Sequence, residues 1–147
     1  MDPPPFDIAA LRKAAGDKMF ARGQGYFEQD AVDVVAADEG RLLARVFGTE
    51  TYRVELLRRA RGFAGSCTCP AFDDWGVCKH MIALALWGNA AAPEDMEIAR
   101  VRWDRLRAPL LALDREALVD KVLDMLLADP EALDALEMGD AYDEDEG

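Results

Sequence analysis

The sequence predicts an α+β protein, with a small antiparallel β-meander between N-terminal helices and C-terminal helices. Two observations lead to this fold class. Between residues 32 and 69, apolar and polar side chains alternate with a period of two, in short segments separated by links of three to five residues. On both sides of that region the apolar spacing is helical, and several segments follow an aspartate that can cap a helix. Links this short favour antiparallel neighbours.

The N-terminal region is expected to form two helices. Asp7 can cap a helix that runs through Ala15 and ends at Gly16, because glycine is common just after a helix C-terminus. Asp17 can cap a second helix, from Lys18 to about Gln29. Two glycines inside this second helix lower its intrinsic helix propensity.

Four short strands are expected next. Their ranges are Val32–Val35, Arg41–Phe47, Thr51–Leu57 and Phe63–Cys69. If Gly48–Glu50 is a three-residue loop, the second and third strands pair so that one face of the hairpin is entirely apolar, and burial selects that register. The apolar face carries Leu42, Ala44, Val46, Tyr52, Val54 and Leu56. On the other face Arg45 then lies opposite Arg53, and like charges in this position normally destabilise a sheet.

The remaining chain is predicted to be helical. From Cys78 to Gly88 nearly every position is apolar, which indicates a helix that is buried all round. Another helix can begin at Pro93 and run to about Arg107. Its inward side chains are expected to be Ile98, Val101 and Leu106.

Two further helices are expected near the C-terminus. Asp114 can cap a helix through Ala128. Asp129-Pro130 places a capping residue before a proline in the first helical position, and so starts a last helix that ends at Met138. Residues 139–147 are acidic and poor in apolar side chains, so we expect a disordered tail there.

All three cysteines and the only histidine fall within fourteen residues, in the pattern Cys-x-Cys, eight residues, Cys-x-His. They are Cys67, Cys69, Cys78 and His80. Three thiolates and an imidazole are a complete tetrahedral ligand set for zinc. Two cysteines two positions apart on a strand point to one face, and the second pair opens a helix. We therefore expect one structural Zn²⁺ that joins the last strand to the buried helix.

Other interpretations of these residues stay open at this point. The cysteines could be ordinary buried side chains and the histidine incidental. The first pair could be a redox pair, or Cys78 and His80 a nucleophile and its base. A catalytic zinc would need an open position for water, whereas four protein ligands close the site. The odd number of cysteines does not suit a secreted disulfide framework. We expect no enzyme.

The pattern resembles the SWIM-type zinc finger, in its surroundings as well as its spacing. In that family a helix with a Gly-and-aromatic segment, here Arg22–Phe27, precedes a small sheet that leads to the first cysteine pair. A proline follows that pair, here Pro70, and a lysine precedes the histidine, here Lys79, before an apolar helix. The resemblance covers about residues 20–88, and the remainder resembles the helical flanks of bacterial stand-alone members.

The resemblance implies both a ligand set and a class of function. The implied zinc ligands are Cys67, Cys69, Cys78 and His80. Family members are modules that bind DNA or protein partners, often beside helicase-like remodelling ATPases. We therefore divide the chain into a SWIM-type zinc-binding domain at 1–88 with its zinc motif at 67–80, a helical extension at 89–138 and the acidic tail at 139–147.

Charge is segregated along the chain. The net charge of −12 opposes non-specific attraction to phosphate. Residues 41–61 nevertheless hold six arginines against two glutamates, a local charge of +4. These arginines are candidates for nucleic-acid or anion binding: Arg41, Arg45, Arg53, Arg58, Arg59 and Arg61. An ordinary solvated charged face would look the same.

The loop between the ligand pairs contains two aromatic residues, Phe72 and Trp75. They could stack on a base or a partner side chain, but we expect them to pack over the metal site instead. Asp73 and Asp74 beside them would repel a phosphate backbone.

The main functional prediction is a non-catalytic zinc-binding interaction module that contacts a protein partner, through the amphipathic segment 114–138. The alternative is a DNA- or RNA-binding protein that uses the arginine-rich sheet face. The longest apolar runs are too short for a membrane span. The start Met1–Pro5 lacks the basic and apolar regions of a signal peptide. We expect a cytoplasmic protein with no membrane contact and no small-molecule substrate.

Overall fold

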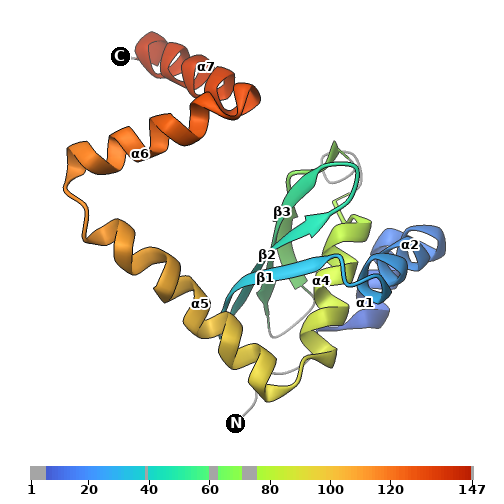
Figure 1. Ribbon diagram of the computed structural model, residues 1–147. Coiled ribbons are helices and arrows are strands. Elements are labelled where there is room, and N and C mark those ends of the chain that lie inside the picture. The colour runs from blue at the N-terminus through green and yellow to red at the C-terminus, as the bar shows by residue number, and fades with distance from the viewer. Residues whose placement is uncertain (1–5, 39, 60–62, 71–75, 147) are drawn as a thin grey trace. The chain divides into compact units, whose positions relative to one another are not determined.

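The computed structural model describes residues 6–38, 40–59, 63–70 and 76–146 (Figure 1). The chain divides into two compact units, Met1–Arg105 and Leu106–Gly147. The first unit holds α1 (Ile8–Ala15), α2 (Asp17–Glu28), β1 (Val32–Ala37), β2 (Arg41–Phe47), β3 (Thr51–Arg58), β4 (Phe63–Cys67), α4 (Lys79–Ala90) and most of α5 (Pro93–Leu111). The second holds the end of α5, α6 (Arg115–Leu127) and α7 (Pro130–Glu146). The predicted α+β fold class is confirmed.

The helix α1 begins and ends as predicted. The Asp7 carboxylate accepts a hydrogen bond from the Ala10 backbone N–H at 3.0 Å, and Gly16 closes the helix with a φ of 89°. The predicted cap of α2 was wrong. Gly16 is also the N-cap of α2, so Asp17 is its first residue and makes no cap bond. The Asp17 carboxylate binds Arg12 at 2.8 Å instead, and its charge suits the positive end of the helix dipole.

The four strands form an antiparallel sheet in the order β1-β2-β3-β4. The predicted register of the central hairpin is confirmed: Leu42 pairs with Leu56, Ala44 with Val54 and Val46 with Tyr52. This gives one wholly apolar face. Arg45 lies opposite Arg53 on the other face, also as predicted.

The outer strands differ from their predicted bounds. A bulge between Val34 and Ala36 lets β1 continue to Ala37 instead of ending at Val35. At the other edge, β4 ends at Cys67 instead of Cys69. The Thr68 hydroxyl accepts a hydrogen bond from the Arg53 backbone N–H at 2.9 Å, so a side chain takes the place of the next ladder bond. Cys69 therefore lies beyond the strand.

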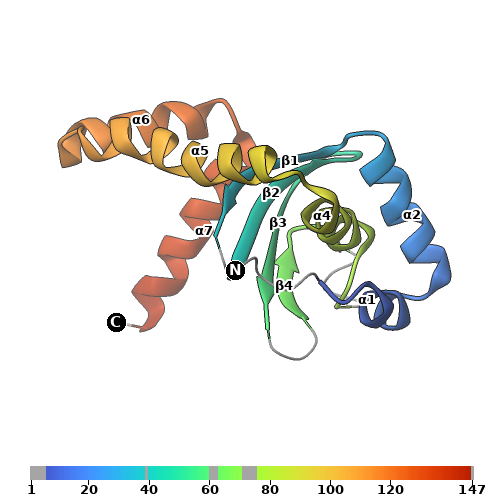
Figure 2. The same ribbon diagram turned by 90° about the horizontal axis from the view of Figure 1, so that it is seen from below.

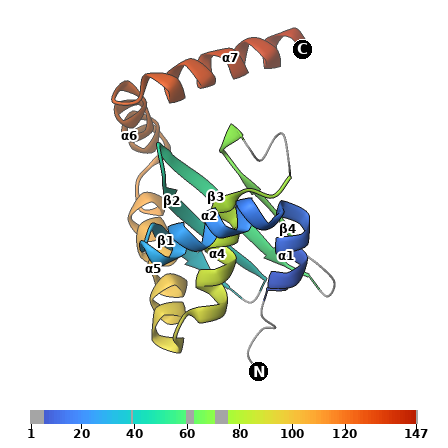
Figure 3. The same ribbon diagram turned by 90° about the vertical axis from the view of Figure 1, so that its right-hand side faces the viewer.

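The core lies between the apolar sheet face and α4, and α1 and α2 cover the other side of α4 (Figures 2 and 3). This position explains why α4 has almost no polar face. Residues Met81 to Ala85 are each at most 1% exposed. The prediction of a helix buried all round is confirmed, although α4 ends at Ala90 and not at Gly88. The predicted domain boundary at residue 88 thus lies inside a helix.

The predicted inward face of α5 was partly wrong. Ala99 is buried, whereas Ile98 is 65% and Leu106 is 49% exposed. Alanine permits a close helix contact but contributes little to a hydropathy pattern, so the larger side chains suggested a neighbouring stripe. The helix also runs past Arg107, through Pro109 to Leu111. The φ of proline is compatible with a helix, although Pro109 cannot donate a backbone hydrogen bond.

The second unit has the predicted caps. The Asp114 carboxylate accepts from the Ala117 N–H at 2.8 Å, and α7 begins at Pro130 directly after Asp129. The predicted end of the last helix at Met138 was wrong, because α7 runs from Pro130 to Glu146. Adding residues to an existing helix costs far less than starting one, and this segment contains no proline. Within the described parts of the chain, none of the helices has the length and apolar character needed to cross a bilayer.

Candidate metal centre

The four predicted ligands meet at one buried point. One ligand atom from each of Cys67, Cys69, Cys78 and His80 lies within 4.8 Å of all the others. Every one of these side chains is at most 6% exposed. The sequence pattern therefore corresponds to a real cluster, between the end of β4 and the start of α4.

The local backbone explains how the ligands converge. Cys67 is the last residue of β4, and its position opposite Val54 turns it toward the apolar face of the sheet. Cys78 has an extended backbone and is the N-cap of α4, which places His80 in the first helical turn. The Cys67 Sγ lies 3.7 Å from the His80 Nδ1. The end of β4 and the start of α4 thus contribute ligands to one site.

Contacts among the thiols set their protonation. The pKa of Cys78 is lowered to about 4, mainly because the Cys67 thiol hydrogen-bonds to its sulfur, with further bonds from His80 and the Met81 backbone N–H. The same contact, together with burial, raises the pKa of Cys67. A metal ion binds both sulfurs as thiolates, so its binding would release the proton of Cys67.

Two tyrosines hold the imidazole of His80. The Tyr52 ring is tilted by 32° to it at 4.5 Å between centroids, and the Tyr26 ring approaches edge-on at 5.2 Å. Nδ1 faces the thiols, whereas the buried Nε2 has no hydrogen-bond partner within the described residues. Nδ1 is therefore the nitrogen in position to bind a metal.

The donor set fits zinc. Ligands at about 2.0–2.3 Å from a tetrahedral ion lie at most about 3.8 Å apart, so the cluster needs to close by at most about 1 Å. Three soft thiolates and a nitrogen, with no carboxylate among them, suit Zn²⁺ and not Mg²⁺ or Ca²⁺. Four protein ligands complete the coordination. The centre is a structural site for one zinc ion.

Comparison with known families agrees with this geometry. The family model described as SWIM zinc finger matches residues 52–86, from Tyr52 in β3 to Leu86 in α4. This stretch contains all four ligands. Residues 52–86 are a SWIM zinc finger. The predicted resemblance is confirmed. No curated protein and no solved structure matches the chain.

Carboxylates neutralise most of the arginines on the outer face of the sheet. Arg45 binds Asp33 at 2.6 Å, and Arg41 binds Glu55 at 3.4 Å. Arg53 lies 4.0 Å from the same Glu55. The like-charge pair across β2 and β3 is therefore relieved within the sheet. Nucleic-acid binding by this face stays a prediction.

The other candidate arginines are not part of that group. The Arg58 guanidinium lies 4.4 Å above the ring of Phe6, and burial lowers its pKa. Arg59 is exposed just after β3. Arg61 lies outside the described residues, as do Phe72 and Trp75, on which the stacking prediction depended.

One polar contact within the first unit was missed in the sequence. Arg102 in α5 binds the Asp33 carboxylate at 2.5 Å and the Val34 carbonyl oxygen at 3.1 Å. The hydrogen bond from Arg102 lowers the pKa of Asp33. No local signal connects two residues this far apart in the chain.

Proposed function

We propose that this protein is a non-catalytic interaction module in which zinc stabilises the fold and a protein partner is bound at the surface. The closed metal site carries this proposal. Four buried protein ligands fill a tetrahedral shell and leave no position for a water or a substrate. Zinc in such a site contributes folding free energy instead of chemistry.

The burial of the cysteines also argues against thiol chemistry. Cys78 is fully buried, and a nucleophile must be reached by its substrate. His80, the only histidine in the chain, belongs to the metal set and is not available as a base. A redox cycle of Cys67 and Cys69 would release the metal on which the sheet–helix junction depends. These points favour a binding role.

The second unit offers an apolar surface for a partner. Helix α6 has no buried residue. Its exposed large apolar side chains and their exposed fractions are Val119 49%, Val122 45%, Leu123 42%, Met125 67% and Leu127 71%. Apolar side chains gathered on one helix are typical of protein–protein contacts. We propose a partner with a complementary apolar groove, and the SWIM family points to helicase-like remodelling ATPases as its class.

The proposal is tested by capture followed by a measured affinity. The full chain and the V119D/L123D variant are used as baits in the native cell, and captured proteins are identified by mass spectrometry. The candidate partner is then purified and titrated against both baits. We expect V119D/L123D to bind at least about tenfold more weakly, because two desolvated aliphatic contacts are lost. K121E is the matched control, since it changes an exposed charge on the same helix.

Two results would contradict the proposal. Equal affinity of V119D/L123D and the parent chain would exclude the α6 surface. A zinc- or thiol-dependent activity that disappears in Cys78→Ser, while the fold survives, would show that the site is catalytic.

A further inference from the structure

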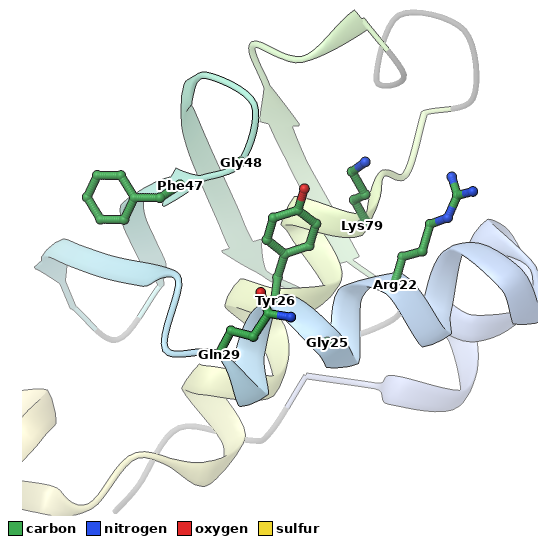
Figure 4. Close-up of a pocket in the computed structure, with 7 residues that line it drawn as sticks. All are labelled: Arg22, Gly25, Tyr26, Gln29, Phe47, Gly48 and Lys79. Atoms are coloured by element: carbon green, nitrogen blue, oxygen red, sulfur yellow. The ribbon is translucent and has the colours of Figure 1, made fainter.

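A pocket of about 540 Å³ opens beside the zinc site. It lies between α2, the first residue of α4 and the turn from β2 to β3 (Figure 4). The side chains that define it are Arg22, Tyr26, Gln29, Phe47 and Lys79, and Gly48 forms part of its wall. Neither the metal site nor the α6 surface includes this pocket.

The pocket carries two positive charges and no negative one. Arg22 and Lys79 are its only ionisable side chains apart from Tyr26. Neither is in an ion pair with any described residue. Figure 4 shows that both side chains extend in the same direction as the Tyr26 hydroxyl. In a chain of net charge −12, two unneutralised cations at one pocket are a site for an anionic group.

The zinc site holds the wall of this pocket in place. The Tyr26 ring packs edge-on against His80, and the Lys79 ammonium lies 5.5 Å above the same ring. Lys79 stands between the ligands Cys78 and His80 in the sequence. A Cβ at Gly48 would lie 3.0 Å from the Tyr26 hydroxyl, so the turn approaches the tyrosine closely. The wall of the pocket therefore packs directly against the metal ligand His80.

We infer that this pocket binds an acidic side-chain pair of a protein partner. This inference rests on the proposed interaction function and names a second contact surface for it. One carboxylate is held by the Arg22 guanidinium, whose fork matches two oxygens, and the other by Lys79. The half-exposed Phe47 and the Tyr26 ring contact the aliphatic parts of the same segment. Arginine and aromatic residues are the types enriched in protein interfaces.

A nucleic-acid strand fits the surroundings of this pocket less well than an acidic side-chain pair does. Duplex DNA carries one charge per about 1.7 Å, so a strand that crosses the pocket brings many phosphates with it. Exposed carboxylates stand at the margins: Glu28 and Asp30 flank Gln29 in the sequence, and Glu50 follows Gly48 in the turn. Two cations are enough for two carboxylates, but they do not offset a row of phosphates.

The test uses zinc-loaded full-length protein and three labelled probes. These are a peptide with two adjacent glutamates flanked by leucines, the same peptide with two glutamines, and a six-nucleotide single strand of thymidine. Binding is followed by fluorescence anisotropy, and the site is located from backbone amide shifts in a ¹⁵N NMR titration. We expect the glutamate peptide to bind at least about tenfold more tightly than the other two probes. Its shift changes should centre on Gly25, Gln29, Gly48 and Lys79.

Charge reversal identifies the residues involved. Arg22→Glu should weaken binding of the glutamate peptide by at least about tenfold, and the double variant R22E/K79E should weaken it by at least about thirtyfold. K13E/K121E changes the net charge of the chain as much as R22E/K79E but lies outside the pocket, and should leave binding within twofold. Arg22→Glu alone decides the question if Lys79→Glu lowers the zinc content. Chelation of zinc should abolish the difference between the peptides.

Several outcomes would contradict the inference that the pocket binds an acidic side-chain pair. Equal binding of glutamate and glutamine peptides, or equal weakening by K13E/K121E, overturns the pocket as an acidic-peptide site. Tighter binding of the oligonucleotide at Gly25 and Gly48 overturns the choice of a protein ligand. The α6 capture experiment does not depend on Arg22. If only the pocket inference is wrong, V119D/L123D still loses its partner.

Discussion

The ring of Tyr52 lies against the imidazole of His80, with 4.5 Å between centroids and 32° between planes. Tyr52 belongs to the apolar face of β3, opposite Val46, whereas His80 is in the first turn of α4. The sheet therefore orients a metal ligand by direct contact. Groups that fix a ligating histidine commonly affect metal affinity almost as much as the ligands do.

We predict that Tyr52→Ala weakens both the fold and the zinc site. Loss of a half-buried ring should lower the free energy of unfolding by about 2 kcal/mol. Loss of the contact with His80 should weaken zinc binding by about 10- to 100-fold. Urea unfolding and competition with a zinc chelator measure these effects. Tyr52→Phe keeps the ring and should change neither by much. Unchanged zinc affinity in Tyr52→Ala would show that the tyrosine does not position His80.

The second prediction concerns zinc itself. Elemental analysis of the purified protein should give one zinc per chain, and Cys78→Ser should remove it. Structural zinc contributes about 10–16 kcal/mol in small finger peptides, so its loss should produce a large fall in unfolding temperature. Thr68→Ser is the control, because it lies between the ligands and keeps the hydroxyl that accepts from Arg53. A folded, metal-free protein of unchanged stability in chelator would refute a structural role.

The metal site and the central hairpin could be predicted from the sequence because both depend on local information. All four ligand types lie within fourteen residues. A three-residue loop and a period of two leave one register for the hairpin that buries only apolar side chains. The bond between Asp33 and Arg102 could not be predicted, since it depends on where α5 crosses the sheet.

The helix caps, ends and faces that the sequence did not predict correctly also have physical explanations. The buried residue of α5 is Ala99, and a small side chain gives a weak periodic signal. Gly16 serves two helices at once, which a rule for single caps does not anticipate. For α7, composition indicated a helix end at Met138, but the preceding turns already provide a helix that can be extended.

The third prediction uses the pH dependence of the Asp33 contact. Hydrogen bonding by Arg102 lowers the pKa of Asp33 below its usual value of 3.8. A carboxyl group with a lowered pKa in the folded state adds stability above its unfolded pKa and loses it as pH falls through the folded pKa. We expect Asp33→Asn to cost about 1 kcal/mol at pH 7, and less as the pH falls below about 4.

The measurement is urea unfolding of both proteins between pH 3 and pH 7, at low and high salt. Salt should reduce the difference, because the Asp33 side chain is 27% exposed. Glu28→Gln is the control: it removes an exposed carboxylate that has no ion pair within the described residues. A difference that stays constant with pH would mean that the Asp33 charge is not the source of the effect.

The last prediction compares two glycines of α2. A Cβ at Gly23 would lie 2.5 Å from the Ile82 Cγ2 and 2.9 Å from the Lys79 carbonyl oxygen, whereas a Cβ at Gly25 would meet nothing within 4 Å. Both substitutions to alanine favour the helix by up to about 1 kcal/mol. Gly25→Ala should therefore stabilise the protein slightly. Gly23→Ala should destabilise it by about 1–3 kcal/mol, because α2 must move away from α4.

Of the two groups that a Cβ at Gly23 would meet, one is a side chain and the other is backbone. The side chain of Ile82 can be shortened, but the Lys79 carbonyl belongs to the backbone between two zinc ligands. In G23A/I82A the clash with the Ile82 side chain is relieved, but the clash with the Lys79 carbonyl oxygen stays. The double variant should therefore lose less stability than the two single variants summed, but it should recover only part of that loss. Gly23→Ala should also weaken zinc binding, since moving the first turn of α4 moves His80. If Gly23→Ala is as stable as Gly25→Ala and binds zinc equally well, the two helices do not pack at this distance, and α2 does not hold the metal-bearing turn in place.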